Sequence, residues 1–286
     1  IKFRALRSGS KGNALLIYTA DGGLLADFAP GCQRDCRALL AEVKKKTALR
    51  GVLVTHAHGD HINRNSLKVL AEAGLNVYCH PKVLAQIKER HGYEYAGIIK
   101  TYESSVTVGC FTAVQAEVEH SPRCYTNALT INTVSSGRAY KAAVFTDLTR
   151  FTPEHITMAA GSDIIYLEAN HDPELLARYG HPGSEFHLSN PQAADFLHRV
   201  CAAGRRKTAR SSKAAGAAAQ TSKSRRGGPE RPLMIFGRDQ LVDHLLGLVG
   251  RHGQHGRVHA LFAADGGQVG HHVAAAPVDD APDLDR

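Results

Sequence analysis

Hydrophobic and polar positions alternate in two short segments at the start of the chain. Residues Lys2 to Arg7 and Asn13 to Thr19 show the period of two that a half-buried strand requires, and a short glycine-containing connection, Ser8 to Gly12, joins them. This pattern predicts a β-hairpin. A third strand is expected at Leu24 to Asp27. Gly51 to Val54 is an unbroken apolar run, which is typical of a strand buried on both faces.

Helical spacing appears between these strands. Residues Cys32 to Lys46 place Leu39, Leu40 and Val43 on one side of a predicted helix. The other predicted helices are Asn63 to Ala73 with Asn63 as the cap, Pro81 to Arg90, Pro153 to Ala160 and Pro191 to Ala203. The other predicted strands are Asn76 to Cys79, Ser105 to Val108, Phe111 to Glu119, Ala128 to Val134, Ala139 to Phe145 and Asp163 to Leu167. A hairpin followed by mixed strands and helices predicts an α/β fold of layered sheets with helices outside.

The composition changes in the last third of the chain. Residues Arg205 to Pro232 are mostly Arg, Lys, Ala, Ser and Gly, so they bury too little apolar surface to offset the entropy cost of ordering, and we predict them to be disordered. The chain is therefore divided into a folded domain over residues 1–203 and, over residues 204–286, a low-complexity basic linker with a poorly ordered tail. Within that tail, Leu233 to Phe236 has the pattern of a strand and Asp239 to Val249 that of a helix.

Charge and cysteine content restrict the class of protein. The formal net charge is +8, and the basic side chains gather between Arg205 and Arg226, a run more typical of a solvated segment than of a site for a polyanion. The six cysteines form no CxxC pair, as expected for reduced thiols in the cytosol. No signal peptide pattern and no membrane-length apolar run is visible in the sequence, so we expect a soluble cytoplasmic protein.

The strongest chemical pattern lies directly after the apolar run Gly51 to Val54. Two histidines spaced two apart in extended backbone point to the same side, so His56 and His58 can share one metal ion, while Asp60 and His61 turn toward a second. Gly59 is expected to permit the tight backbone path. The alternative is a surface loop that is merely rich in histidine.

This His-Ala-His-Gly-Asp-His segment resembles the HxHxDH signature of the metallo-β-lactamase superfamily. The resemblance implies a four-layer αββα sandwich that binds two divalent metal ions, Zn²⁺ or Mn²⁺. It also implies a third histidine for the first ion and an aspartate that bridges both ions, each at the end of a later strand. His120 and Asp147 occupy those positions in this sequence.

Four segments resemble the WalJ-like subgroup of that superfamily, also named VicX or YycJ. They are Ser8-Gly9-Ser10-Lys11-Gly12-Asn13, Leu53-Val54-Thr55-His56, Glu168-Ala169-Asn170-His171-Asp172 and His187-Leu188-Ser189-Asn190. The subgroup is associated with nuclease-type cleavage of phosphodiesters, so DNA is the expected substrate and exonuclease the expected activity. Basic residues near the first hairpin, such as Arg7 and Lys11, are compatible with phosphate contacts and equally with solvation.

The sequence departs from the subgroup in two places. The connection Pro173 to Phe186 is shorter than in the family, and Phe186 stands where a glycine is expected. The family also takes its last metal ligand from a histidine after one more strand, and the basic run from Arg205 stands there instead. We therefore expect the fold to be incomplete at its C-terminal end and the second metal site to be weakened. We also expect the C-terminal third to be of non-homologous origin. His187, His259 or His271 could substitute as the missing ligand.

The expected reaction is hydrolysis by a hydroxide that bridges the two ions, without a protein nucleophile. Asp60 would also orient that hydroxide, and His187 would contact a substrate phosphate or protonate the leaving group, unless it is only structural. Glu168, Asn170 and His171 are expected near the same rim. Two alternatives stay open: a hydrolase for a small thioester, lactone or cyclic phosphodiester, and a catalytically impaired binding or regulatory protein that lacks the last ligand.

Overall fold

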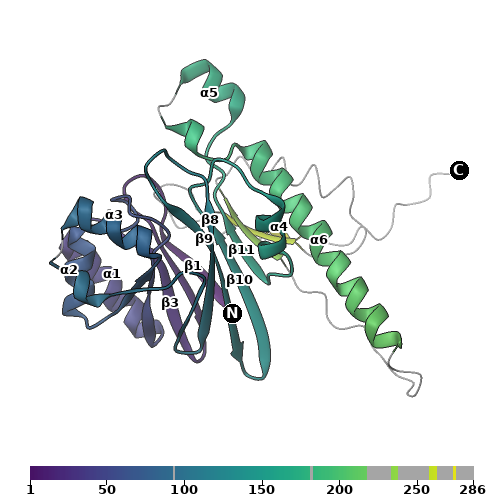
Figure 1. Ribbon diagram of the computed structural model, residues 1–286, viewed down its shortest axis with the longest axis horizontal. Helices are drawn as coiled ribbons and strands as arrows, with labels where there is room; N and C mark the ends of the chain where they lie inside the picture. The colour runs from purple at the N-terminus through teal and green to yellow at the C-terminus, as the bar shows by residue number, and fades with distance from the viewer. Residues whose placement is uncertain (93, 181–182, 218–232, 238–257, 263–272, 275–286) are drawn as a thin grey trace, which may run out of the picture.

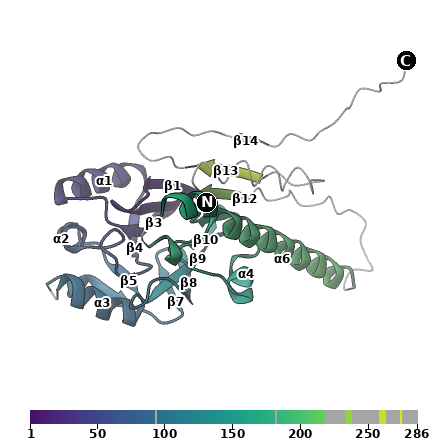
Figure 2. The same cartoon turned by 90° about the horizontal axis from the view of Figure 1, so that it is seen from above.

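The computed structural model contains two β-sheets that lie against each other between two groups of helices (Figures 1 and 2). The structure describes residues 1–92, 94–180, 183–217, 233–237, 258–262 and 273–274. Within these ranges no helix has the length and apolar character needed to cross a membrane. The two sheets between two groups of helices confirm the predicted αββα layering.

The first sheet has the strand order β1-β2-β3-β4-β5-β6. Its strands are β1 (Lys2–Arg7), β2 (Ala14–Thr19), β3 (Gly22–Phe28), β4 (Leu49–Leu53), β5 (Val77–Cys79) and β6 (Ile99–Thr101). The first three pair antiparallel, and from β3 onward the neighbours are parallel. The predicted hairpin and the buried strand β4 are present. The three residues of β6 carry no periodic signal, which is why the sequence did not predict that strand.

The second sheet has the strand order β14-β13-β12-β11-β10-β9-β8-β7. Its strands are β7 (Ser105–Val108), β8 (Phe111–Val118), β9 (Thr126–Ser135), β10 (Arg138–Phe145), β11 (Ile164–Leu167), β12 (Leu233–Gly237), β13 (Val258–Phe262) and β14 (Val273–Ala274). Strands β7 to β10 form an antiparallel meander, and β10 to β13 are parallel. The end of β10 and the end of β11 therefore lie at the same edge of the sheet.

Helices cover the outer face of each sheet. Helices α1 (Gln33–Lys46), α2 (Arg64–Glu72) and α3 (Pro81–His91) lie on the side of the first sheet, and α4 (Pro153–Ala159) and α6 (Asn190–Ala217) on the side of the second (Figure 1). A short helix, α5 (Pro173–Tyr179), lies in the connection before α6. The period of two in β2 divides the core: Leu16 packs toward the helices, whereas Leu15 and Ile17 pack between the sheets.

The C-terminal part differs from the sequence-based expectation. Helix α6 does not end at Ala203 but continues to Ala217, so the prediction of a disordered segment from Arg205 is wrong for its beginning. Alanine, lysine and arginine are good helix formers, and once the apolar stripe of α6 has docked, the helix propagates through them. Residues 218–232 and the predicted helix Asp239 to Val249 lie outside the described residues. The division of the chain after residue 203 stays a prediction.

A strand does follow α6. The predicted strand near Leu233 is present as β12, which pairs in parallel with β11. The next residue in the sequence is Arg238, not a histidine. The predicted strand is therefore present, and the expected histidine does not directly follow it.

Candidate metal centre

The segment from Thr55 to His61 forms a turn between β4 and α2. The backbone N–H groups of His61 and Ile62 both donate to the carbonyl oxygen of His58 at 3.0 Å, and Asn63 caps α2 by accepting from the Ser66 N–H. The predicted need for Gly59 is wrong, because a Cβ there would meet nothing within 4 Å and its φ is not positive. The turn is therefore held by hydrogen bonds and by the helix cap, not by glycine.

Three histidine nitrogens converge on one side of this turn. His56 Nε2 lies 3.0 Å from His58 Nδ1, which lies 3.4 Å from Nε2 of His120. His120 follows β8 in the second sheet, so the two sheets together make this group. The predicted residues of the first metal site are thus brought together.

In the His56 and His120 rings, hydrogen bonds to Nδ1 determine that Nε2 keeps its lone pair. The Thr55 hydroxyl donates to Asp27, so it accepts the N–H of His56 Nδ1 at 3.0 Å. Nδ1 of His120 donates to the carbonyl oxygen of Phe186 at 2.9 Å. Phe186, which stands where the family has a glycine, thus contributes through its backbone. The Nε2 atoms of His56 and His120 both face the centre with lone pairs.

Burial keeps these imidazoles neutral. It lowers the pKa of His56 well below its usual value, lowers the pKa of His58 to about 4, and lowers the pKa of His120. A neutral imidazole can offer a lone pair to a cation, whereas a protonated one cannot. This arrangement fits a divalent metal ion bound through nitrogen.

A second group of donors lies beside the first. His61 Nε2 lies 2.9 Å from Oδ2 of Asp147 and 3.6 Å from Oδ2 of Asp60. The other ring nitrogen of His61 donates to Asp27 Oδ2 at 2.8 Å. The ligand atoms of His56, His61 and Asp147 lie within 4.8 Å of one another, close enough to hold a divalent cation, and Asp60 lies beside His61.

The charges of this second group depend on one another. Burial opposes the charged form of His61, but Asp147 and Asp27 outweigh it and raise the pKa of His61 well above its usual value. Burial likewise opposes ionisation of Asp147, and His61 outweighs it, so the pKa of Asp147 is held well below its usual value. These carboxylates therefore favour a positive charge at His61, and the same surroundings would favour a bound cation.

Two aspartates of the centre have left-handed backbone. Asp27 has φ 57° and Asp147 has φ 50°, a conformation that is uncommon outside glycine, although aspartate adopts it more readily than most residues. The Asp147 N–H donates to Glu168 Oε2 at 2.7 Å, which holds this backbone in place. Such a conformation at a cluster of ligand-type side chains is typical of a functional site.

His187 lies against the carboxylates of the second sheet. Its Nδ1 is 3.0 Å from Glu168 Oε2 and 3.4 Å from Asp147 Oδ1. Burial lowers the pKa of His187, but the hydrogen bond to Glu168 and the negative charges of Glu168 and Asp147 together outweigh it, so the net shift is upward. His120, Asp147 and His187 are also close enough to hold an ion, with their ligand atoms within 4.8 Å of one another.

The sequence did not single out several residues that shape the centre. Asp27 was placed only in a strand, although it contacts both Thr55 and His61. Asn13 was noted only as part of a motif, although its amide lies 3.2 Å from Asp60 Oδ2. Cys124 brings its thiol within 4.8 Å of the ligand atoms of His56 and His58. Only chain folding unites these residues, so no local pattern could identify them.

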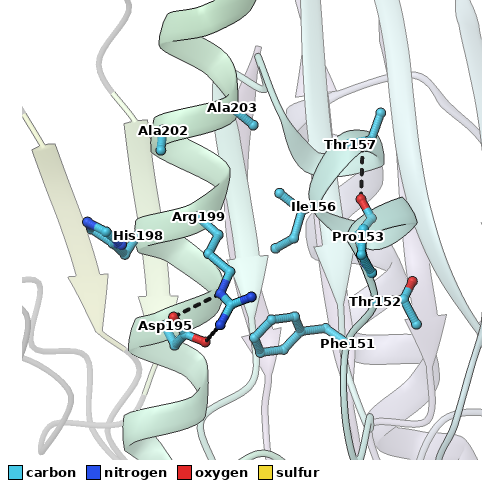
Figure 3. Close-up of a pocket in the computed structure, with 10 residues that line it drawn as sticks. All are labelled: Phe151, Thr152, Pro153, Ile156, Thr157, Asp195, His198, Arg199, Ala202 and Ala203. Atoms are coloured by element: carbon cyan, nitrogen blue, oxygen red, sulfur yellow. Dashed lines mark hydrogen bonds and ion pairs between the residues drawn. The ribbon is translucent and has the colours of Figure 1, made fainter.

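A hollow of about 720 Å³ lies elsewhere, between α4 and α6 (Figure 3). Its lining includes Phe151, Ile156 and Arg199, and the Arg199 guanidinium pairs with Asp195 on the same helix. None of the predicted site residues line it. The candidate site is therefore defined by its converging ligand atoms, not by the size of a hollow.

Comparison with known proteins agrees with this geometry. Residues 25–207, more than half of the chain, match the family described as the beta-lactamase superfamily domain. The chain belongs to this superfamily. It is accordingly a metallo-β-lactamase-fold hydrolase, and the predicted family is confirmed.

Relatives and solved structures are consistent with that assignment. The chain is 25% identical over 219 residues to the exodeoxyribonuclease WalJ of Streptococcus pneumoniae strains D39 and R6, covering 70% of this chain and 76% of the relative. The metallo-β-lactamase fold protein YhfI from Bacillus subtilis superposes with a TM-score of 0.54 at 16% identity, over 88% of this chain and 89% of YhfI. Zn²⁺-bound PqqB from Methylobacterium extorquens has a TM-score of 0.50 at 15% identity, over 62% of this chain and 68% of PqqB. The subgroup resemblance to WalJ is thus found across most of the chain.

Proposed function

We propose that this metallo-β-lactamase-fold hydrolase is a metal-dependent phosphodiesterase that degrades DNA as an exonuclease. The observation that carries the proposal is the convergence of ligand atoms from both sheets, His56, His58 and His61 from one turn with His120 and Asp147 from the other sheet. The resemblance to the exodeoxyribonuclease WalJ supports DNA as the substrate. The donor set suits Zn²⁺ or Mn²⁺.

Distances between ligand atoms support the roles that we assign. We assign His56 Nε2, His58 Nδ1 and His120 Nε2 to one ion, and Asp60, His61 Nε2 and Asp147 to the other. Two divalent ions bound there would make a water acidic enough to supply hydroxide near neutral pH and would offset charge on the phosphate. Asp60 keeps part of its carboxylate exposed, so it can also orient the attacking water.

His187 is the proton donor for the leaving oxygen in this proposal. Glu168 accepts the proton of Nδ1, which leaves Nε2 to face the substrate, and the raised pKa of His187 keeps the ring protonated over a wider range of pH. Proton donation matters for DNA because the leaving group is a sugar hydroxyl, a poor leaving group when it departs as an alkoxide. Glu168 acts on the reaction through His187 and is a positioning residue.

The test is digestion of linear DNA by the full chain with and without added Mn²⁺ or Zn²⁺. Metal-dependent release of nucleotides is expected, closed circular DNA should stay intact, and His58→Ala should abolish the release. His198→Ala, which removes an exposed histidine of α6, is the matched control and should digest DNA at the normal rate. Hydrolysis of thioesters or lactones without any digestion of DNA would reject the nuclease proposal.

A further inference from the structure

The loop between β1 and β2 contacts the metal centre through one side chain. Asn13 is bonded by its backbone on two sides: its N–H donates to the carbonyl oxygen of Asp60 at 2.7 Å, and its carbonyl accepts from the Ala29 N–H at 2.9 Å. The loop that precedes β2 is therefore attached directly to the turn that carries Asp60.

The side chain of Asn13 has a defined orientation. Its Oδ1 accepts from the backbone N–H of Gly9 at 3.1 Å, so the NH₂ group must point the other way. That NH₂ donates to Oδ2 of Asp60 at 3.2 Å and to the Asp60 carbonyl at 3.3 Å, and it lies 3.0 Å from His61 Nε2. One amide therefore meets two of the three proposed ligands of the second ion.

The surroundings leave this amide little freedom to move away. The void beside Asn13 has a volume of about 10 Å³, enough for no more than one water molecule, and Asp27 and Tyr166 line it. On the other side, Gly12 lies so close to Ala29 that a Cβ would come within 2.0 Å of the Ala29 carbonyl oxygen. The close packing fixes Asn13 against Asp60.

We propose that Asn13 is a positioning residue for the second metal ion. Its amide holds the Asp60 carboxylate in the rotamer that lies 3.6 Å from His61 Nε2, so this carboxylate is in place before the ion binds. A hydrogen bond to a ligating carboxylate of this kind contributes roughly 10- to 100-fold to metal affinity. The effect is expected at the second site, because Asp60, which the Asn13 amide contacts, is assigned to that ion alone.

This inference rests on the proposed two-metal centre, and the experiment distinguishes failure of the inference from failure of that centre. Wild-type protein, Asn13→Ala and Asn13→Ser are freed of metal and titrated with Co²⁺, whose visible absorption reports the coordination of each ion. We expect two binding events in the wild type. In both variants the dissociation constant of the weaker event should rise by roughly 10-fold or more, while that of the tighter event stays unchanged. Asn13→Ser keeps a polar side chain in the loop in case Asn13→Ala does not fold, as judged by circular dichroism.

Ser10→Ala is the matched control, since Ser10 is an exposed residue of the same loop, and it should bind both ions like the wild type. Wild-type affinity for both ions in the Asn13 variants would overturn the inference. An equal rise in the dissociation constants of both ions would also overturn it, because that result would show a general loosening of the folded structure. If the wild type itself binds fewer than two ions, the two-metal centre fails, and this inference fails with it.

Discussion

Glu168 shows how one side chain can serve two parts of the centre. Its Oε2 accepts from the backbone N–H of Asp147 at 2.7 Å and from His187 Nδ1 at 3.0 Å, while Oε1 accepts from the Asn170 amide at 3.3 Å. The same carboxylate thus holds the backbone of Asp147 in place and keeps a proton on Nδ1 of His187. The segment Glu168 to His171 was predicted to lie near the rim of the site, but which of its side chains faces inward could not be derived from sequence.

At this scale the role of His187 can be tested by changing the leaving group. His187→Gln should lower kcat on DNA by roughly 10²- to 10⁴-fold, because the sugar oxygen then leaves without a proton. The same variant should lose much less activity on bis(p-nitrophenyl) phosphate, whose leaving group needs no proton. The kcat values of both substrates are measured for wild type and variant. Equal losses on the two substrates would argue that His187 is structural or a metal ligand.

At the scale of elements, the length and strength of the local pattern decided which predictions were confirmed. The long amphipathic helix α1 and the strand β8 were predicted within a residue or two. The short elements β6 and α5 were not predicted, because a few residues show no period. Helix α6 was predicted too short, because its apolar stripe ends before the helix does.

The turn before β2 offers a second prediction. Gly12 has φ +147°, and a Cβ there would lie 2.0 Å from a carbonyl oxygen, so Gly12→Ala should displace the loop and destabilise the protein. Gly161→Ala is the matched control, since Gly161 also has a positive φ, +77°, but open space around it. The control should cost about 1–2 kcal/mol for its conformation alone, and Gly12→Ala should cost more. Urea unfolding of both variants measures the difference, and equal costs would show that the close approach is unimportant.

At the scale of the whole molecule, the proposed metal centre lies between the two sheets. The turn after β4 in the first sheet carries His56, His58 and His61, whereas His120 and Asp147 follow β8 and β10 of the second sheet. An ion bound by both sets therefore connects the two halves of the fold. Anything that binds only the folded state stabilises it, so the ions should contribute to stability as well as to catalysis.

Metal removal should therefore lower the melting temperature. At an ion concentration 100 times the dissociation constant, the bound ion contributes about 2.7 kcal/mol to the free energy of unfolding. Thermal unfolding of wild type is followed by circular dichroism after chelation and after readdition of Zn²⁺. His58→Ala should show a smaller difference between the two conditions, and His198→Ala the same difference as wild type. An unchanged melting temperature in the wild type would contradict a shared metal centre.

The sequence by itself determined the layered α/β fold, the buried strand β4 and the His-Ala-His-Gly-Asp-His turn, because each depends on neighbouring residues whose spacing repeats or matches a ligand geometry. His120 and Asp147 were predicted from the resemblance to the superfamily, which implies a histidine and an aspartate after later strands. Only the tertiary structure decided that Asn13 and Asp27 contact that turn and that the Phe186 carbonyl orients His120. Those contacts join residues far apart in the chain, and their partners are chosen by how the two sheets pack.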